Sequence, residues 1–404
     1  MTRPSVVTFP AARSAASPAP RFDAIAAAER VAQTLLPDAA ARDRLGASPR
    51  KELELLSGSG LLPLLNPQEH GGGGGSFTDA LLAVRVIGRA DASIAQLLAY
   101  HYLHLTNALW RATPEQGAAL SRASVAGNWF WGGASNPRDP ESRLTAVEDG
   151  FRLTGRKTFA SNAALADRIT LRAELNDGFA VLVVPGDREG VTHGNDWDAF
   201  GQRLSESGTI TFADVHVGKD EVLGDPAAAP PPRTSLVVPF HQLLIVNFYL
   251  GTAEGALSEA NRYIRTVSRP WQASNVEKAS LDPYILEHYG LLDVDLRASL
   301  ALADVAAERF EAAAARANDI TLDERNIAAG AIYAAKVHSS RTALEITARI
   351  FELMGARATA GHYGFDRFWR NIRTHTLHDP VVYKAREVGN YALNGTITPT
   401  PLYS

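Results

Sequence analysis

The chain has 404 residues, of which 46% are hydrophobic and 21% are charged, and its formal net charge is −4. This composition is typical of a globular protein and excludes a disordered, collagen-like or disulfide-scaffold chain. The sequence contains no cysteine, which excludes disulfides, thiolate nucleophiles and cysteine-ligated metal clusters. Because the charge is nearly balanced, it gives no general attraction for nucleic acid or anionic lipid, and we expect neither as a partner.

Two segments bear on where the protein resides. Residues 1–20 are rich in Ala, Pro, Ser and Thr and carry two Arg but no acidic residue. We interpret them as a disordered tail, with a transit peptide as the alternative. The longest apolar stretch, Leu236–Leu250, is interrupted by Pro239, His241 and Asn247, and it falls short of the ~20 residues that a membrane span requires. The sequence therefore predicts a cytoplasmic protein without a membrane span.

Residues 21–123 are predicted to form an N-terminal helical domain. Phe22–Leu36 is rich in alanine and has no interior glycine or proline, so it predicts a helix. Thr78–Arg89 and Ala92–Trp110 carry apolar residues at helical spacing. Gly71–Gly75 cannot hold a helix and predicts a loop before them.

Residues 124–233 are predicted to form a central domain of β-strands. Phe151–Thr154 and Thr209–Phe212 alternate apolar and polar residues, while Phe179–Val184 is a continuous apolar run bounded by turn residues. Several short strands with turns between them favour an antiparallel barrel or sandwich.

Residues 234–404 are predicted to form a C-terminal helical bundle and a tail. The proline-rich segment Gly224–Thr234 leads into them and is stiff rather than flexible. Ile285, Tyr289 and Leu292 step by four and three residues, as the buried face of a packed helix does. The order along the chain is therefore helices, a small β domain and a long helical bundle.

The common nucleotide-binding and hydrolase motifs are missing from the sequence. Gly58-Ser59-Gly60 is followed by Pro63 where a dinucleotide-binding loop needs a third glycine. There is no phosphate-binding loop ending in Gly-Lys-Ser/Thr and no Gly-x-Ser-x-Gly elbow. Hydride transfer from a Rossmann-bound nicotinamide, nucleotide hydrolysis and α/β-hydrolase chemistry are therefore disfavoured.

Two histidine pairs, His101/His104 and His375/His378, are each spaced by three residues. On a helix this spacing places both rings on one face, which is compatible with metal binding. The chain contains no Glu-x-x-His, the spacing that di-iron sites in bundles use, so we predict no metal. The alternative is that these histidines are half-buried and hydrogen-bonded to their neighbours.

The second histidine pair has informative neighbours. The aromatic and cationic run Arg367–Asn371 precedes it, and Asp379-Pro380 follows it. Because proline ends a helix or opens the next one, His378 and Asp379 are expected at a helix junction. Such a junction beside an aromatic cluster is a candidate site. The alternative is a capping aspartate beside a packed aromatic seam.

The order of the predicted domains and two local strings resemble the acyl-CoA dehydrogenase superfamily from about residue 22 to the end. Leu61–Gly72 resembles the N-terminal loop of that family, and Gly155–Ala163 resembles the barrel strand that lies against the flavin ring. The resemblance implies a mainly α fold: an N-terminal helical domain, a central antiparallel β-barrel and a C-terminal four-helix bundle. It also implies a flavin between barrel and bundle, and a homotetramer.

Within the superfamily the chain is most similar to flavin-dependent monooxygenases of the dibenzothiophene monooxygenase type, which include sulfur-acquisition enzymes. Dehydrogenases place a catalytic Glu-Gly near the last helix junction, whereas this chain reads His378-Asp379-Pro380 and has no Glu between Leu353 and Ala385. The strings that carry the similarity are Asn195–Trp197, Arg269–Trp271, Gly355–Arg357, Tyr363–Asn371 and His375–Pro380.

This second resemblance implies a two-component monooxygenase that takes FMN as FMNH2 from a separate NAD(P)H:flavin reductase. It would use O2, through a flavin C4a-hydroperoxide, to oxygenate a small organosulfur compound such as a sulfide, sulfoxide, sulfone or sulfinate. The alternatives are an FAD-dependent acyl-CoA dehydrogenase whose base comes from elsewhere in the bundle, an oxygenase acting on nitrogen or carbon, and an inactive helical scaffold.

The resemblance also implies roles for single residues. The predicted catalytic residues are His101, Ser161 and His378, because imidazole and hydroxyl groups donate hydrogen bonds where a carboxylate would repel negative charge. Predicted cofactor-binding residues are Phe159, Ser161, Trp197, Arg269, Gly355 and Arg357, with the two arginines reaching the flavin phosphate of a neighbouring subunit. Predicted substrate-binding residues are His101, Asn128, Asn136 and Trp197. Gly133 stands where related monooxygenases often carry an Asn, a contact that Asn128 or Asn136 could replace.

Overall fold

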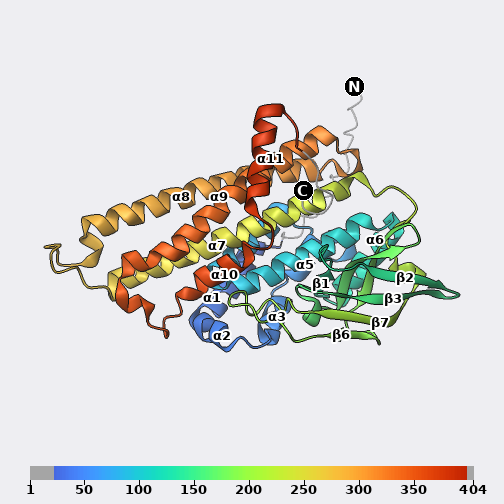
Figure 1. Cartoon of the computed structure of the whole chain (residues 1–404), viewed down its shortest axis with the longest axis horizontal. Coiled ribbons are helices and arrows are strands. Elements are labelled where there is room, and N and C mark those ends of the chain that lie inside the picture. Colours follow the sequence, from blue (N-terminus) through green and yellow to red (C-terminus); the bar gives the residue numbers. More distant parts are fainter. Residues whose placement is uncertain (1–21, 398–404) are drawn as a thin grey trace, which may run out of the picture.

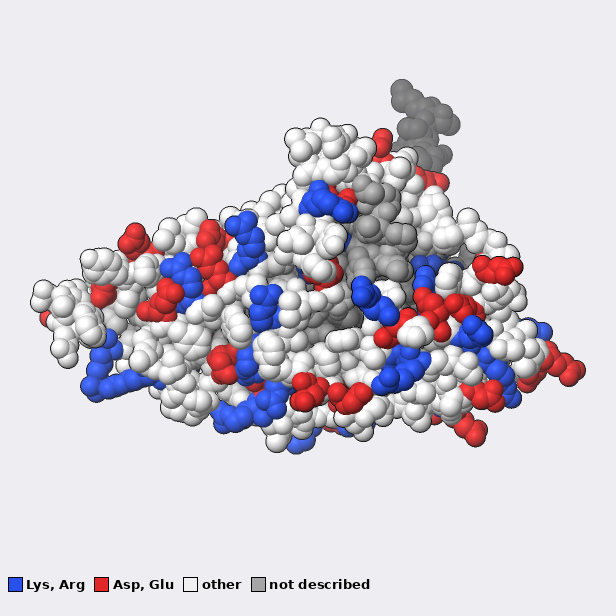
Figure 2. Space-filling model, viewed as in Figure 1, with Lys and Arg blue, Asp and Glu red and all other residues white. Residues whose placement is uncertain are grey.

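The computed structural model describes residues 22–397, so the predicted tail 1–20 lies outside the described residues. The long helices run along the long axis of the molecule, α11 stands across it, and the β-strands gather at one end (Figure 1). On the face shown in Figure 2, Lys and Arg side chains are interspersed with Asp and Glu, without an extended region of one sign.

From residue 22 onward, where the described part of the chain begins, six helices form the N-terminal part, and polar caps fix several of their starts. Asp23 accepts a hydrogen bond from the Ala26 amide at 2.9 Å, and Ser76 and Thr113 each form a reciprocal capping box. The six helices are α1 (Ala24–Leu35), α2 (Ala39–Leu45), α3 (Arg50–Gly58), α4 (Phe77–Ala90), α5 (Ala92–Arg111) and α6 (Pro114–Ala126).

The strands form one mixed seven-stranded sheet in which β4 is central. β4 pairs antiparallel with β5 along one edge, and parallel with both β1 and β2 along the other. The path then continues antiparallel from β2 through β3 and β7 to β6. The strands are β1 (Trp131–Ala134), β2 (Ser142–Val147), β3 (Gly150–Lys157), β4 (Arg168–Leu175), β5 (Gly178–Pro185), β6 (Val191–His193) and β7 (Ile210–Val217).

The predicted fold class is confirmed, with one correction to its sheet. Within the described residues the sheet does not close into a barrel, and two of its strand pairs are parallel. The reason is that β1 skips the β2–β3 hairpin and pairs with β4 instead, in the register Trp131 opposite Arg168. A bulge at Leu153/Gly155 bends β3 against β7. Gly155 is needed there, because its φ is +156° and a Cβ would lie 2.4 Å from the Ser142 hydroxyl.

Up to residue 397, the C-terminal bundle contains three long helices and two short ones. α7 packs against α4 and α5 on one side and against α8 and α9 on the other. The fourth position of the bundle is divided between α10 and α11, because the chain breaks at Thr376–Pro380, where the junction was predicted. The helices are α7 (Val237–Thr266), α8 (Pro283–Ala314), α9 (Leu322–Met354), α10 (Asp366–His375) and α11 (Val381–Asn394).

The central helix α7 is the most apolar of these. The segment Pro232–Thr266 is long and apolar enough to cross a membrane, but 83% of its most apolar window is buried inside the protein. Phe240, Leu243 and Phe248 are fully buried within it. Its composition is therefore that of a bundle core helix, packed on both sides by other helices.

Candidate functional site

The predicted site residues that the structure brings together lie where the sheet meets the bundle. One side is formed by β1 and by the loops that follow β3 and precede β7. The other side is formed by α5, α7 and the break between α10 and α11, which pack on one another. The backbone N–H of Gln202 donates to Asn371 Oδ1 at 2.7 Å, and this bond joins the loop before β7 to α10.

Ser161 begins a chain of three hydroxyl groups on the sheet side. Its Oγ lies 2.7 Å from Ser207 Oγ, which lies 2.8 Å from Ser205 Oγ. All three serines are buried. Each hydroxyl can donate one hydrogen bond and accept others. This row of three hydroxyl groups can therefore present an O–H donor at Ser161.

Phe159 and Trp197 stand next to this chain as an aromatic pair. Phe159 has a positive φ of 52°, and 66% of its surface is exposed, which is unusual for a large aromatic residue. Its ring contacts Trp197 edge-on at 6.0 Å, and Trp197 Nε1 donates to the Gln202 carbonyl at 2.8 Å. Phe159 is therefore not part of the sheet core, and its strained backbone holds an apolar face outward.

His101 is fully buried, and both of its ring nitrogens are hydrogen-bonded inside the protein. Its Nδ1 accepts a hydrogen bond from the Trp131 amide at 3.2 Å, and its Nε2 donates to the Leu62 carbonyl at 2.8 Å. Its ring stacks on Phe130, with centroids 5.6 Å apart. Burial lowers its pKa to about 4, against the opposing effect of the Leu62 carbonyl. Because both ring nitrogens are bonded within the protein, this geometry does not favour contact between His101 and a substrate.

His104, one turn further along α5, occupies the space that Gly133 leaves. A Cβ on Gly133 would lie 1.9 Å from His104 Cε1, so the ring rests directly on the glycine backbone. His104 Nδ1 lies 2.8 Å from Thr170 Oγ1 on β4. Burial, and then the nearby His101, lower the pKa of His104 to about 3. The imidazole of His104 is therefore neutral and fills the space that a side chain at position 133 would take.

Five rings on the bundle side form what we call the histidine cluster: Tyr100, His241, Tyr249, His375 and His378. The two nitrogens of His375 lie between the two phenols, with Tyr100 Oη at 3.1 Å and Tyr249 Oη at 2.9 Å. The rings of His375 and His378 stack at 5.4 Å, and His241 meets His378 edge-on at 5.1 Å. The break after α10 places His378 over this cluster, with 30% of its side chain exposed.

The histidine cluster is neutral at its buried positions. Burial lowers the pKa values of His241 and His375 well below the ordinary value, and the neighbouring His378 lowers both further. Burial also raises the pKa of Tyr249 well above its ordinary range. The buried part of the cluster therefore presents the neutral imidazoles of His241 and His375 and the protonated phenol of Tyr249, which can donate hydrogen bonds without carrying a full charge.

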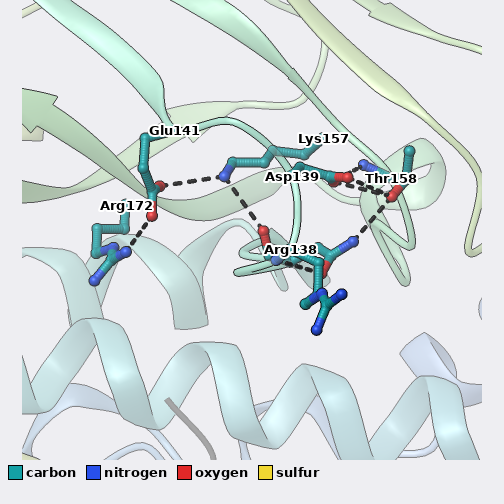
Figure 3. A network of polar contacts seen from close by, with 7 residues as sticks. Arg138, Asp139, Glu141, Lys157, Thr158 and Arg172 are labelled. Carbon is teal, nitrogen blue, oxygen red and sulfur yellow. Dashed lines mark hydrogen bonds and ion pairs between the residues drawn. The ribbon is translucent and has the colours of Figure 1, made fainter. Parts of the chain in front are cut away.

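A polar network holds the loop between β1 and β2 against the end of β3 (Figure 3). Asn136 Nδ2 donates to Thr158 Oγ1 at 2.9 Å, next to Phe159. The buried Lys157 donates to the Asn136 carbonyl at 3.3 Å and to Glu141 at 3.2 Å. The Asn136 side chain is thus used to position the loop, and its predicted contact with substrate stays a prediction.

Four other predicted residues lie away from this site within one chain. Asn128 Nδ2 donates to Ser57 Oγ at 2.6 Å and so ties the end of α6 to α3. Arg269 lies in the α7–α8 connection, and Gly355 and Arg357 lie in the α9–α10 connection. Both connections lie at the end of the bundle opposite the sheet (Figure 1). Their predicted phosphate contacts therefore require a second subunit.

Several residues of the site had no individual signal in the sequence. His241 is visible in the sequence only as an interruption of an apolar run. Ser205 and Ser207 lie in a segment without a recognisable motif. Tyr100 lies in a predicted helix, but its position beside His375 depends on how α5 packs against α10. The spacing of His375 and His378 was visible, whereas their partners were not.

The residues present fit a flavin between the sheet and the bundle. Among the described residues, His241 Nε2, Thr374 Oγ1 and both side-chain polar atoms of Gln202 are buried without a hydrogen-bond partner. Each unpaired buried polar atom costs about 1–3 kcal/mol. A ring system with polar edges, placed against the exposed face of Phe159, would supply such partners.

Comparisons with known proteins agree with this geometry. Models of the acyl-CoA dehydrogenase N-terminal, middle and C-terminal domains match residues 24–127, 132–215 and 243–382. SfnC of Pseudomonas putida, a probable FMNH2-dependent monooxygenase, is 38% identical over 388 residues, which cover 95% of this chain and 98% of SfnC. The chain belongs to the acyl-CoA dehydrogenase family. Its predicted place in the flavin-dependent monooxygenase branch is confirmed.

Two solved structures of this family superpose on nearly the whole chain. Methanesulfinate monooxygenase MsuC of Pseudomonas fluorescens is 36% identical with a TM-score of 0.91, and the match covers 94% of this chain and 99% of MsuC. The dibenzothiophene monooxygenase TdsC of Paenibacillus sp. A11-2, solved with FMN bound, is 39% identical with a TM-score of 0.91, covering 95% and 100%. At the level of the family, the predicted enzyme class and the predicted cofactor FMN are confirmed.

Proposed function

We propose that this protein is an FMNH2-dependent monooxygenase that oxygenates a small organosulfur compound and receives reduced flavin from a separate NAD(P)H:flavin reductase. The observation that carries the proposal is the histidine cluster at the α10–α11 break, where dehydrogenases of this family need a glutamate. No Glu lies between Leu353 and Ala385, so the base that removes a carbon-bound proton is missing there. Two relatives with nearly full coverage, MsuC and TdsC, support the sulfur assignment.

Bound FMNH2 would supply two electrons and two protons, so that one oxygen atom of O2 reaches the sulfur and the other leaves as water. The role of the protein is to exclude water and to place neutral hydrogen-bond donors where negative charge develops. Ser161 at the end of its hydroxyl chain offers one such donor from the sheet side. The imidazole of His378 offers an N–H donor from the bundle side.

The exposed ring of Phe159 and the half-buried ring of Trp197 are proposed to pack against the flavin and to wall the substrate cavity. Their edge-on contact and the strained φ of Phe159 hold this wall in one orientation. Asn136 acts through the loop network of Figure 3. Because Gly133 admits the ring of His104, a neutral imidazole takes over the polar role of the missing Asn.

The assembly and the location of the enzyme are also proposed. Arg269 and Arg357 lie at the remote end of the bundle, so a homotetramer would bring them to the flavin phosphate of a neighbouring subunit. Arginine suits this role because it binds phosphate through two parallel hydrogen bonds. A cytoplasmic location would give the partner reductase access to NAD(P)H.

The test is to mix the purified protein with photoreduced FMN, O2 and a panel of sulfides, sulfoxides, sulfones and sulfinates. We expect an oxygenated product from at least one of them, without a nicotinamide cofactor in the assay. Rapid flavin oxidation that yields only hydrogen peroxide with every compound would contradict the sulfur assignment. A protein purified with tightly bound FAD that an acyl-CoA reduces directly would instead indicate a dehydrogenase.

A further inference from the structure

A buried lysine of α9 lies directly beneath the α10–α11 break. Lys336 is 1% exposed, and its Nζ lies 3.8 Å from Asp379 Oδ1 and 4.7 Å from the ring centre of Tyr249. Within residues 22–397 this ammonium group has no hydrogen-bond partner. A buried charge is costly unless it is paired, so its place beside Asp379 needs a reason.

The carboxylate of Asp379 is shared between two groups. Its Oδ1 lies 3.2 Å from Nδ1 of His378 and faces Lys336 at the same time. Its Oδ2 is buried and has no partner in the described part of the chain, and the residue is 5% exposed. Asp379 therefore has an imidazole on one side and an ammonium group on the other, and both contacts involve a single oxygen.

This arrangement connects α9 with the histidine above it. Without Lys336, the carboxylate would keep one bond to His378 and could rotate about its own side chain. With Lys336, the position of Oδ1 is restrained from below by a helix that is rigidly packed against α7 and α8. Carboxylates that receive the N–H of a functional histidine fix its ring orientation and tautomer in this manner.

We propose that Lys336 is a positioning residue: its ammonium group holds Asp379, and Asp379 fixes the ring of His378 at the α10–α11 break. The catalytic part of this inference rests on the proposed function, since it assigns His378 a role in oxygenation. The connection from Lys336 through Asp379 does not rest on it.

The surroundings of Lys336 make the connection sensitive to pH. Burial lowers the pKa of Lys336 to about 8, Asp379 opposes this effect, and Lys384 on α11 reinforces it. Tyr249 and His241 on α7 and His375 on α10 also face it. When the Lys336 ammonium group loses its proton above pH 8, the ion pair with Asp379 is lost. The restraint on Asp379 therefore weakens in a pH range in which enzymes stay folded.

The first experiment uses the protein without flavin. Lysine side chains carrying ¹³C at Cε are titrated by NMR, and the resonance of Lys336 is assigned by its absence in Lys336→Met. We expect a midpoint near pH 8 that moves to lower pH in Asp379→Asn, because the stabilising negative charge is gone. Ser340→Ala is the matched control: it removes a buried hydroxyl that donates to the Lys336 carbonyl at 2.7 Å and changes no charge. An unmoved midpoint in Asp379→Asn would overturn the proposal.

The second experiment measures product and hydrogen peroxide per FMNH2 oxidised, between pH 6.5 and about pH 9.5. We expect the product fraction of the unmodified enzyme to fall above pH 8, and Lys336→Met to show the low fraction at every pH. The expected loss at pH 7 is roughly tenfold, the low end for losing a partner that orients a functional histidine. Lys336→Arg keeps a charge at high pH and should remove the fall above pH 8.

The two experiments separate the two ways of failing. If the unmodified enzyme forms no sulfur product but Asp379→Asn shifts the lysine midpoint, the proposed function fails while the Lys336–Asp379 connection stands. If product forms and Lys336→Met keeps both the yield and the pH profile of Ser340→Ala, the positioning role is wrong. Should Lys336→Met not fold, the pH profile of the unmodified enzyme and the Asp379→Asn titration decide the matter.

Discussion

The two histidine pairs of this chain share the same spacing, but the structure uses them in opposite ways. His101 and His104 lie within one continuous helix, α5, and the nitrogens of His101 are bonded to the Leu62 carbonyl and the Trp131 amide. His375 ends α10, and His378 lies beyond it in the break. The position of a helix end, rather than the spacing, therefore decides which histidine can reach a ligand.

The largest expected effect belongs to the second pair. His378→Ala should lower the yield of oxygenated product per flavin oxidised by about 100-fold, the scale of losing one positioned proton donor, with hydrogen peroxide released instead. His362→Ala, an exposed histidine before α10, is the control and should keep the yield. Full coupling in His378→Ala would remove His378 from the mechanism and break the comparison.

The first pair should affect stability instead. His101→Phe keeps the stacking on Phe130 but leaves the Trp131 amide and the Leu62 carbonyl without partners. We expect a loss of about 3 kcal/mol in the free energy of unfolding, measured in denaturant on the flavin-free protein. Among the folded molecules the product yield should stay near that of the unmodified enzyme. A collapse of the yield without a loss of stability would show that His101 takes part in the chemistry.

The pH dependence of stability sharpens the same contrast. The pKa of His101 falls from 6.5 to about 4 on folding, so below pH 6.5 the unfolded chain binds more protons than the folded one. His101 thus contributes stability that is present above pH 6.5 and is lost as the pH falls toward 4. The slope of 1.36 kcal/mol per pH unit predicts a loss of about 3 kcal/mol. Unfolding curves of His101→Phe should lack this part of the acid sensitivity.

The smallest expected effect concerns His104 and Gly133. Gly133→Ala places a Cβ inside the His104 ring, so the ring must leave Thr170, at a cost of about 1–3 kcal/mol. In a His104→Ala background the same change should cost little, because the obstruction is gone. A double-mutant cycle of unfolding free energies measures the difference. Equal costs in both backgrounds would show that the ring and the glycine are independent.

Much of the fold could be predicted because local pattern and final packing agree. The apolar periodicity of α5 and α7 and the glycine loop before α4 each depend on neighbouring residues only. The pairing of β1 with β4 could not be predicted, since Trp131 meets Arg168 across an intervening hairpin. That long-range choice is also why the sheet stays open.

The candidate site likewise contains features that the local sequence predicts and features that depend on long-range packing. Pro380 indicated the helix break, and with it the position of His378 at the junction. The phenols that bond His375 come from α5 and α7, and Lys336 comes from α9, so their meeting depends on the packing of four helices. No local pattern marks a lysine that will be buried against an aspartate.

The division of the fourth bundle position into α10 and α11 has a consequence for how this enzyme could diversify. The turn that carries His378 is held by α11 and α9, whereas Phe159 and Ser161 are held by the sheet. Substitutions between α11 and α9 would tilt one wall of the proposed site while leaving the proposed flavin-binding face in place. Relatives could thereby accept differently shaped sulfur compounds through changes in helix packing alone.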